Sequence, residues 1–113
     1  MIEAYSFGNI KVAGENYTSD IKIVDGKVVS NWWRKTGHEV DVDDVADILA
    51  SDVEILVVGK GQPGMMKVTG RLKKELSGKG IKLIEKPTAE AYVEFNRLFS
   101  EGKKVAGAFH LTC

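Results

Sequence analysis

The amino-acid sequence predicts an α/β fold: a single three-layer domain with a mixed, largely parallel central sheet, flanking helices and an N-terminal antiparallel β section. Residues 1–40 carry apolar side chains at period two and are interrupted by glycines, which is typical of short antiparallel strands. After residue 41, helical and strand patterns alternate with short connections, which favours parallel strands covered by helices. A chain of 113 residues has room for one hydrophobic core, so we expect one domain over residues 1–113.

The N-terminal part of the chain is expected to form short strands. The strongest local pattern is Asp25-Gly26 between two apolar runs, because a two-residue type I′ turn needs a positive φ at both central positions. This pair predicts a β-hairpin. The strands are expected at residues 2–7, 9–13, 20–24 and 27–33.

Three helices and three buried strands are expected in the rest of the chain. Asp41 can cap the first helix and Thr88 the third, because a short polar side chain satisfies the free backbone N–H groups of a first turn. The strands are expected at residues 54–58, 81–84 and 105–111. Residues at helical spacing mark the helices: Val42, Val45, Ile48 and Leu49; Met65, Thr69, Leu72 and Leu76; Ala91, Tyr92, Phe95, Leu98 and Phe99.

The charge balance argues against nucleic acid and membrane partners. Sixteen Lys and Arg residues match sixteen Asp and Glu residues, and no apolar run has the length of a membrane span or a signal peptide. We therefore expect a cytoplasmic protein. Residues 1–56 carry eleven acids and five bases, whereas residues 57–113 carry five acids and eleven bases. This asymmetry favours a homodimer or a basic surface for an anionic ligand, unless the charges interleave on the folded surface.

Metal and cofactor chemistry have little support in the residue inventory. His38, His110 and Cys113 are the only histidines and cysteine, and they cannot form a zinc site without carboxylates, so no metal and no cofactor are expected. The odd spacing of His110 and Cys113 on a strand would send their side chains to opposite faces. No catalytic residue is assigned, and the role of Cys113 stays open. Whether the chain is an enzyme also stays open, with a non-catalytic role favoured.

A glycine-rich loop follows the first expected parallel strand. Gly59, Lys60, Gly61 and Gly64 belong to a G-x-G-x-x-G pattern, in which backbone amides and a helix N-terminus can bind a phosphate. Glu85 lies where a dinucleotide-binding fold places its ribose-binding acid. These residues are a candidate anion-binding loop. The alternative is a tight turn in which the glycines only let the backbone reverse.

A second unusual cluster contains Trp32, Trp33, Arg34 and His38. Adjacent strand residues point in opposite directions, so one tryptophan is expected in the core and the other at the surface. An exposed tryptophan beside an arginine is a common anchor for a protein partner or an anionic ligand. These four residues are therefore a candidate contact surface. In the alternative interpretation, Arg34 only stacks on an indole ring and His38 fixes a turn.

Four stretches together resemble a small family of uncharacterised α/β domains: Tyr5-Ser6-Phe7-Gly8-Asn9-Ile10, Asn31-Trp32-Trp33-Arg34 with Gly37-His38, Leu56-Val57-Val58-Gly59-Lys60-Gly61, and His110-Leu111-Thr112-Cys113. This family is typified by an archaeal hypothetical protein and has relatives among adipogenesis-associated proteins and a mitochondrial complex I assembly factor. The resemblance implies a three-layer α/β domain with an added β layer and no established activity.

The sequence thus leads to two functional hypotheses. The first is a cytosolic, non-catalytic protein-interaction or assembly domain with an unknown protein partner, which contacts it through the region from Trp32 to His38. The alternative is a protein or enzyme that binds a phosphate- or nucleotide-bearing small ligand through the loop from Gly59 to Gly64.

Overall fold

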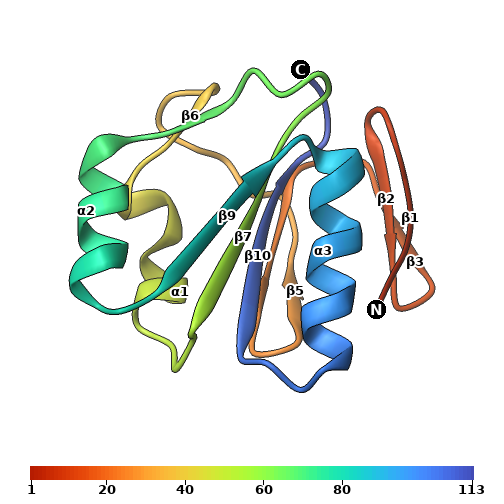
Figure 1. Ribbon diagram of the computed structural model, residues 1–113. Helices are drawn as coiled ribbons and strands as arrows, with labels where there is room; N and C mark the ends of the chain where they lie inside the picture. Colours follow the sequence, from red (N-terminus) through yellow and green to blue (C-terminus); the bar gives the residue numbers. More distant parts are fainter.

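A computed structural model of the chain describes residues 1–113. Its centre is a mixed five-stranded sheet in the order β5-β4-β10-β7-β9 (Figure 1). The two pairs β10–β7 and β7–β9 are parallel, whereas β10–β4 and β4–β5 are antiparallel. This confirms the predicted fold class. The bounds are β4 Ile21–Val24, β5 Lys27–Val29, β7 Ile55–Lys60, β9 Lys82–Lys86 and β10 Val105–His110.

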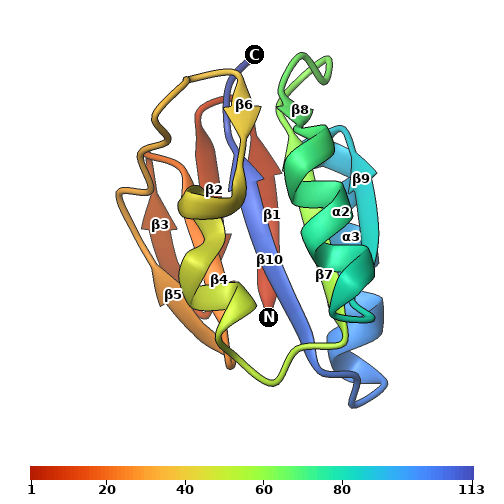
Figure 2. The same cartoon turned by 90° about the vertical axis from the view of Figure 1, so that its left-hand side faces the viewer.

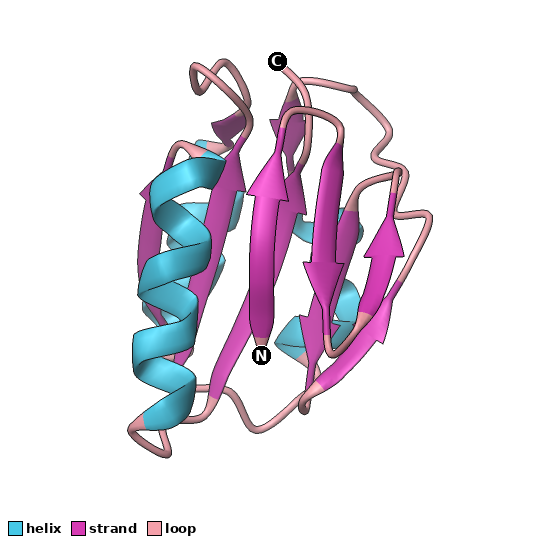
Figure 3. Cartoon of the chain, turned by 90° about the vertical axis from the view of Figure 1, so that its right-hand side faces the viewer, coloured by secondary structure: helices cyan, strands magenta, loops and turns pink.

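One face of this sheet is covered by the N-terminal strands and the longest helix. Strands β1 (Ile2–Ser6), β2 (Asn9–Val12) and β3 (Glu15–Tyr17) form an antiparallel sheet beside helix α3 (Thr88–Ser100), as Figure 3 shows. Strand β3 was not predicted. The core on this side consists of Ile2, Ile10, Val12, Ile21, Ile23, Ile55, Val57, Ala91, Phe95, Leu98, Val105, Phe109 and Leu111.

The other face is covered by shorter elements (Figure 2). They are the 3-10 helix η1 (Val42–Val45), helices α1 (Ala46–Leu49) and α2 (Gly70–Gly78), and a small parallel pair of strands that was not predicted, β6 (Glu39–Val40) with β8 (Lys67–Val68). The core here consists of Trp32, Val40, Val45, Ile48, Leu56, Val58, Met66, Val68, Leu72, Leu76, Ile81, Ala106 and Ala108. Neighbouring residues of β7 and β10 belong to different cores, so both strands are buried on both faces. No helix combines the length and hydropathy needed to cross a membrane.

The predicted hairpin at Asp25-Gly26 is confirmed. Both residues have a positive φ, 52° and 74°, and Val24 pairs with Lys27 across the turn. Strand β5, however, ends at Val29, four residues before the predicted end. The two tryptophans therefore lie in a loop, and strand alternation does not determine where their side chains point.

Two predictions about helix starts need correction. Asp41 caps the first helical segment as predicted, with a reciprocal hydrogen bond from its own N–H to the Asp44 carboxylate, but the first turn is a 3-10 helix. The second helix begins at Gly70, with Thr69 accepting from Leu72 N, so Met65 belongs to the preceding loop. Thr88 does not cap α3, because Pro87 occupies the cap position and the Thr88 hydroxyl is hydrogen-bonded elsewhere.

Candidate functional site

A polar cavity of about 380 Å³ lies at the carboxyl end of β10. Ligand sites of open α/β sheets lie at the carboxyl ends of parallel strands, and β10 runs parallel to β7 here. Only one of its nine lining residues is hydrophobic, in contrast to most small-molecule pockets. The lining residues are Thr18, Ser19, Asp20, Trp33, Arg34, Gly37, His38, His110 and Thr112.

Strand pairing brings Asp20 and His110 together across ninety positions of sequence. In the antiparallel pair β4–β10, Phe109 lies opposite Ile21, and extending that register by one residue places His110 opposite Asp20. Because side chains alternate along β10, His110 lies on the same face as Ala106 and Ala108. The cluster is therefore built on the central sheet.

Asp20 accepts hydrogen bonds from three donors. Its Oδ2 lies 2.7 Å from His110 Nδ1 and 2.9 Å from Arg34 Nη2, and its Oδ1 accepts from the backbone N–H of Leu111 at 2.8 Å. Since a carboxylate only accepts, His110 carries its proton on Nδ1. Burial works to raise the pKa of Asp20, but the hydrogen bonds from His110, Leu111 and Arg34 outweigh it and hold that pKa below its ordinary value.

Arg34 is held in place by the chain around it. Its Nε and Nη2 donate to the carbonyl oxygen of Gly37 at 3.1 and 2.8 Å, and its Cζ lies 4.6 Å from the centre of the Trp32 ring. Trp32 is itself fixed by a 2.9 Å hydrogen bond from Nε1 to the carbonyl oxygen of Asp44. The side chain of Arg34 is only 5% exposed. Arg34 therefore stacks on an indole ring, as the alternative interpretation of this stretch predicted, and the ring is that of Trp32.

The two adjacent tryptophans have opposite environments. Trp32 is 5% exposed and part of the core, whereas Trp33 is 81% exposed and lines the cavity. This division agrees with the expectation of one buried and one exposed indole. The loop conformation after β5 produces it, with Asn31 in the left-handed region at φ 53°.

His38 also lines the cavity and faces His110. The two rings meet edge to face, with their centres 6.0 Å apart. No three His, Cys, Asp or Glu side chains are grouped as metal ligands would be. Of the four residues of the predicted contact surface, Trp33, Arg34 and His38 line the cavity, whereas Trp32 supports it from the core.

Backbone N–H groups of the glycine-rich loop are hydrogen-bonded to other parts of the chain. The backbone N–H of Gly61 donates to the Thr88 hydroxyl at 2.9 Å, and that of Gln62 donates to the carbonyl oxygen of Thr112 at 3.0 Å. Pro63 has no N–H to offer. The loop leads into β8 and not directly into a helix, so it lacks the helix N-terminus that the motif requires.

The glycine at position 61 is required by close packing. Its φ of 87° is strained for residues with a side chain, and a Cβ there would lie 2.8 Å from His110 Cδ2. Gly61 therefore fits the alternative interpretation of the loop, in which glycines only let the backbone turn. Lys60 and Glu85 do meet, at 3.7 Å, and Glu85 also pairs with Lys73 at 3.4 Å. Glu85 thus neutralises lysines of its own chain.

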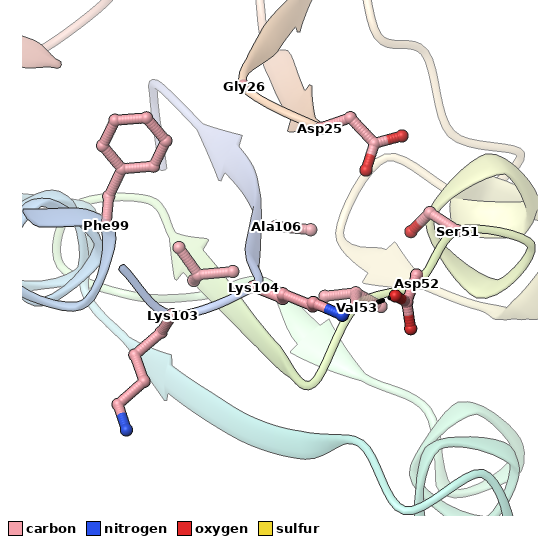
Figure 4. A pocket seen from close by; sticks show the side chains of 10 residues that line it. Asp25, Gly26, Ser51, Asp52, Val53, Phe99, Lys103, Lys104 and Ala106 are labelled. Atoms are coloured by element: carbon pink, nitrogen blue, oxygen red, sulfur yellow. Dashed lines mark hydrogen bonds and ion pairs between the residues drawn. The ribbon is translucent and has the colours of Figure 1, made fainter. Parts of the chain in front are cut away.

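A second pocket, of about 260 Å³, lies at the opposite end of β10 (Figure 4). Lys104 there reaches Asp52 at 2.6 Å, whereas Lys103 extends away from the other lining side chains. This ion pair joins the acidic and basic halves of the sequence, as does the pair between Arg71 and Asp41 at 3.4 Å. Part of the charge asymmetry is therefore satisfied within one chain.

Sequence reasoning missed Asp20 as a site residue, and it considered His110 only as a zinc ligand or a partner of Cys113, neither of which it favoured. No local pattern points to Asp20, because its role depends on the pairing of β4 with β10. Cys113 is exposed beyond the end of β10. Strand β10 itself offers one indication: a histidine ends an otherwise apolar buried strand.

Several solved structures share this fold, and three of them illustrate the range of similarity. The conserved hypothetical protein PH1505 from Pyrococcus horikoshii OT3 is 29% identical with a TM-score of 0.86, and the match covers 100% of this chain and 99% of that one. A crystal structure described as an outer membrane protein from Bartonella henselae is 21% identical with a TM-score of 0.81, covering 99% and 94%. A Bordetella pertussis protein described as a Mth938-like domain is 18% identical with a TM-score of 0.73, covering 97% and 84%.

The likeness to PH1505 agrees with the resemblance to an archaeal hypothetical protein, and the two more distant structures support the fold alone. A family model matches residues 2–110, which is nearly the whole chain. The chain therefore belongs to the family described as "Protein of unknown function (DUF498/DUF598)".

Proposed function

We propose that this chain is a cytosolic, non-catalytic protein-interaction domain that contacts its partner with the end of the molecule carrying the polar cavity. One observation carries the proposal: Trp33 lines the cavity and is 81% exposed, whereas the preceding residue, Trp32, is buried in the core. An exposed indole of this size is costly in water and is among the most frequent anchors of protein interfaces.

The surroundings of Trp33 support this proposal. Three connections lie at the end of the molecule that holds the C-terminus: the β1–β2 turn, the loop after β7 and the loop before β6 (Figure 1). Each carries an exposed apolar side chain, namely Phe7, Met65 and Trp33. The turn is joined to the chain end by a 2.8 Å hydrogen bond from Gly8 N to Leu111 O. Exposed aromatic and Met side chains at one end of the molecule match the composition of interfaces, in which aromatic residues, Met and Arg are enriched.

The test compares affinity capture by the wild-type chain, Trp33→Ala and Val93→Ala. Val93 is a matched control, because it is an exposed apolar residue on α3, away from the cavity. We expect one protein to be captured equally by the wild type and Val93→Ala and about tenfold less by Trp33→Ala, as for an interface anchor. The loss must be reproduced with the purified partner. If every captured protein binds Trp33→Ala and the wild type equally, the proposal is wrong.

The same surface can be tested for a homodimer. A second copy of the chain is one partner that the opposite charges of the two sequence halves favour. Analytical ultracentrifugation would show a mass twice that of the 12.4 kDa chain, and the dimer would weaken in Trp33→Ala if this surface forms the contact. A monomer at all concentrations would leave only a different protein as the partner.

A further inference from the structure

We infer that the cavity lined by Trp33 is a binding site for a carboxyl group, recognised by Arg34 and His110. The inference does not rest on the proposed protein partner, because a small organic acid is enough to test it. The carboxyl group can belong to a free organic acid or to the C-terminus of a peptide, and a titration with both kinds of compound separates these sources.

Two buried polar atoms at this cavity have no hydrogen-bond partner in the chain: Arg34 Nη1 and His110 Nε2. The side chains that carry them are 5% and 9% exposed. A buried polar atom without a partner is costly, and native proteins rarely leave one in place. Because both side chains line the cavity, we assign the missing interactions to a group bound there, for which the atoms that now cover Arg34 Nη1 and His110 Nε2 must move aside.

The chemistry of the two atoms limits what this group can be. Arg34 Nη1 can only donate, so the ligand must present an acceptor to it. His110 Nε2 accepts while the ring is neutral and donates when the ring is protonated, because Nδ1–H is committed to Asp20 at 2.7 Å. A carboxyl group fits both states: as the acid it donates its O–H to the neutral ring, and as the carboxylate it accepts from the protonated ring. One of its oxygens then accepts from Arg34 Nη1.

Asp20 does not exclude an anion from this site. Its two oxygens are engaged by three donors, Arg34, His110 and the N–H of Leu111, so its charge is compensated within the chain. Its main effect is positional: it fixes the planes of the guanidinium and the imidazole, which approach to 3.2 Å between Nη2 and Nδ1. A carboxyl group meets side chains that are already oriented.

A phosphate group fits this cavity less well. It has more oxygens and more charge than a carboxyl group, and phosphate sites normally supply several backbone N–H groups. The N–H groups of the neighbouring glycine-rich loop, in Gly61 and Gln62, already donate to Thr88 and Thr112. Arg34 Nη1 and His110 Nε2 are the two buried side-chain atoms that lack a partner, and two such atoms match the two oxygens of a carboxyl group.

The remainder of the ligand is expected to be flat and apolar. Trp33 is the single hydrophobic residue that lines the cavity, and its indole offers a face for stacking. A volume of about 380 Å³ lies near the lower end of the range for small-molecule sites. Benzoate combines a carboxylate with a flat ring and is therefore a suitable probe.

The test is a titration of the ¹⁵N-labelled chain with benzoate, followed by the amide, arginine Nε–H and histidine ring resonances. Benzamide has the same shape without the charge, and inorganic phosphate tests the other anion. We expect saturable shifts at Arg34, His110 and Gly37, with benzoate at least about tenfold tighter than either control, the fold-change of one charge-assisted hydrogen bond. An acetylated peptide with a free C-terminus, compared with its amidated form, tests the second source.

Three variants decide whether the cavity is responsible. Arg34→Lys should weaken benzoate binding about tenfold, because lysine lacks the planar fork of nitrogens, whereas Arg97→Lys on the exposed face of α3 should leave it unchanged. Trp33→Ala, at an exposed position, should preserve the fold and weaken binding severalfold even if Arg34→Lys unfolds the chain. The inference is overturned if benzoate and benzamide give the same unsaturable shifts, if phosphate binds more tightly than benzoate, or if Trp33→Ala and Arg34→Lys bind benzoate like the wild type.

Discussion

Asp20→Ala tests the buried cluster most directly. The substitution removes the acceptor for Arg34 Nη2, His110 Nδ1 and the N–H of Leu111 at 2.9, 2.7 and 2.8 Å, and leaves a guanidinium that is 5% exposed without a counter-charge. Removing one member of a buried ion pair costs about 3–5 kcal/mol. That is a large part of the roughly 5–15 kcal/mol that stabilises an ordinary domain.

The expected shift in Tm follows from chain length. An unfolding entropy of about 2.1 cal/mol/K per residue gives about 240 cal/mol/K for this chain, so each kcal/mol lowers Tm by about 4 °C. Asp20→Ala should then lower Tm by about 12–20 °C. Its matched control is Asp52→Ala, because Asp52 also forms an ion pair, with Lys104, but at an exposed position. A surface pair is worth about 0–1 kcal/mol, so Tm should fall by less than about 4 °C.

Calorimetry and urea unfolding followed by circular dichroism would measure both variants. The double variant Asp20→Ala with Arg34→Met should be more stable than Asp20→Ala alone, because it no longer buries an unpaired charge. Equal Tm values for Asp20→Ala and Asp52→Ala would refute the argument. A double variant that is less stable than Asp20→Ala would show that the cost does not come from the guanidinium.

Three further predictions follow from the same contacts. The pKa of Asp20 in the folded chain lies below its ordinary value of 3.8, so the contribution of this carboxylate to the free energy of unfolding is complete above pH 3.8 and is lost as the pH falls through the folded-state pKa. In acid titrations, Asp20→Asn should therefore lose less stability than the wild type. Gly61→Ala should lower stability by at least about 1–3 kcal/mol, because its Cβ meets His110 and its φ is positive; urea midpoints measure this. Trp32→Phe should cost about 0.5–1.5 kcal/mol in the same assay, because Asp44 O loses one of its two buried donors and keeps Lys22 Nζ at 3.3 Å.

Local patterns predicted most of the scaffold. The Asp25-Gly26 turn and the apolar runs that became β7 and β10 are determined by neighbouring residues, and the structure has them where expected. Elements of two or three residues, such as β3 and the pair β6–β8, were missed because their stability comes from the strands beside them. Thr88 was assigned as a cap because its position suits one, but its hydroxyl instead bonds Gly61 N and His110 O.

The candidate site was predictable only in part. The Trp32–His38 stretch is unusual in composition and was found, whereas the role of Asp20 depends on a strand register that joins residues 90 positions apart. The glycine loop shows the opposite error. The glycine pattern is typical of phosphate-binding loops, but here close packing explains Gly61, because it lies against His110 and Thr112. The motif lacked the structural context that gives it a function.

A triple substitution separates a binding role of the buried cluster from a role in stability. Well-packed apolar residues that replace a buried ion pair often leave stability unchanged or raise it, since charges are costly to desolvate. We therefore expect the triple variant Asp20→Val, Arg34→Met, His110→Phe to have a Tm close to that of the wild type. This Tm should be at least as high as that of the double variant Asp20→Ala with Arg34→Met. Benzoate binding should be lost. Calorimetry and the benzoate titration measure the two properties separately. A folded triple variant without binding would show that Asp20, Arg34 and His110 serve a ligand at some cost to the fold. A triple variant that fails to fold would mean that the cluster is part of the scaffold.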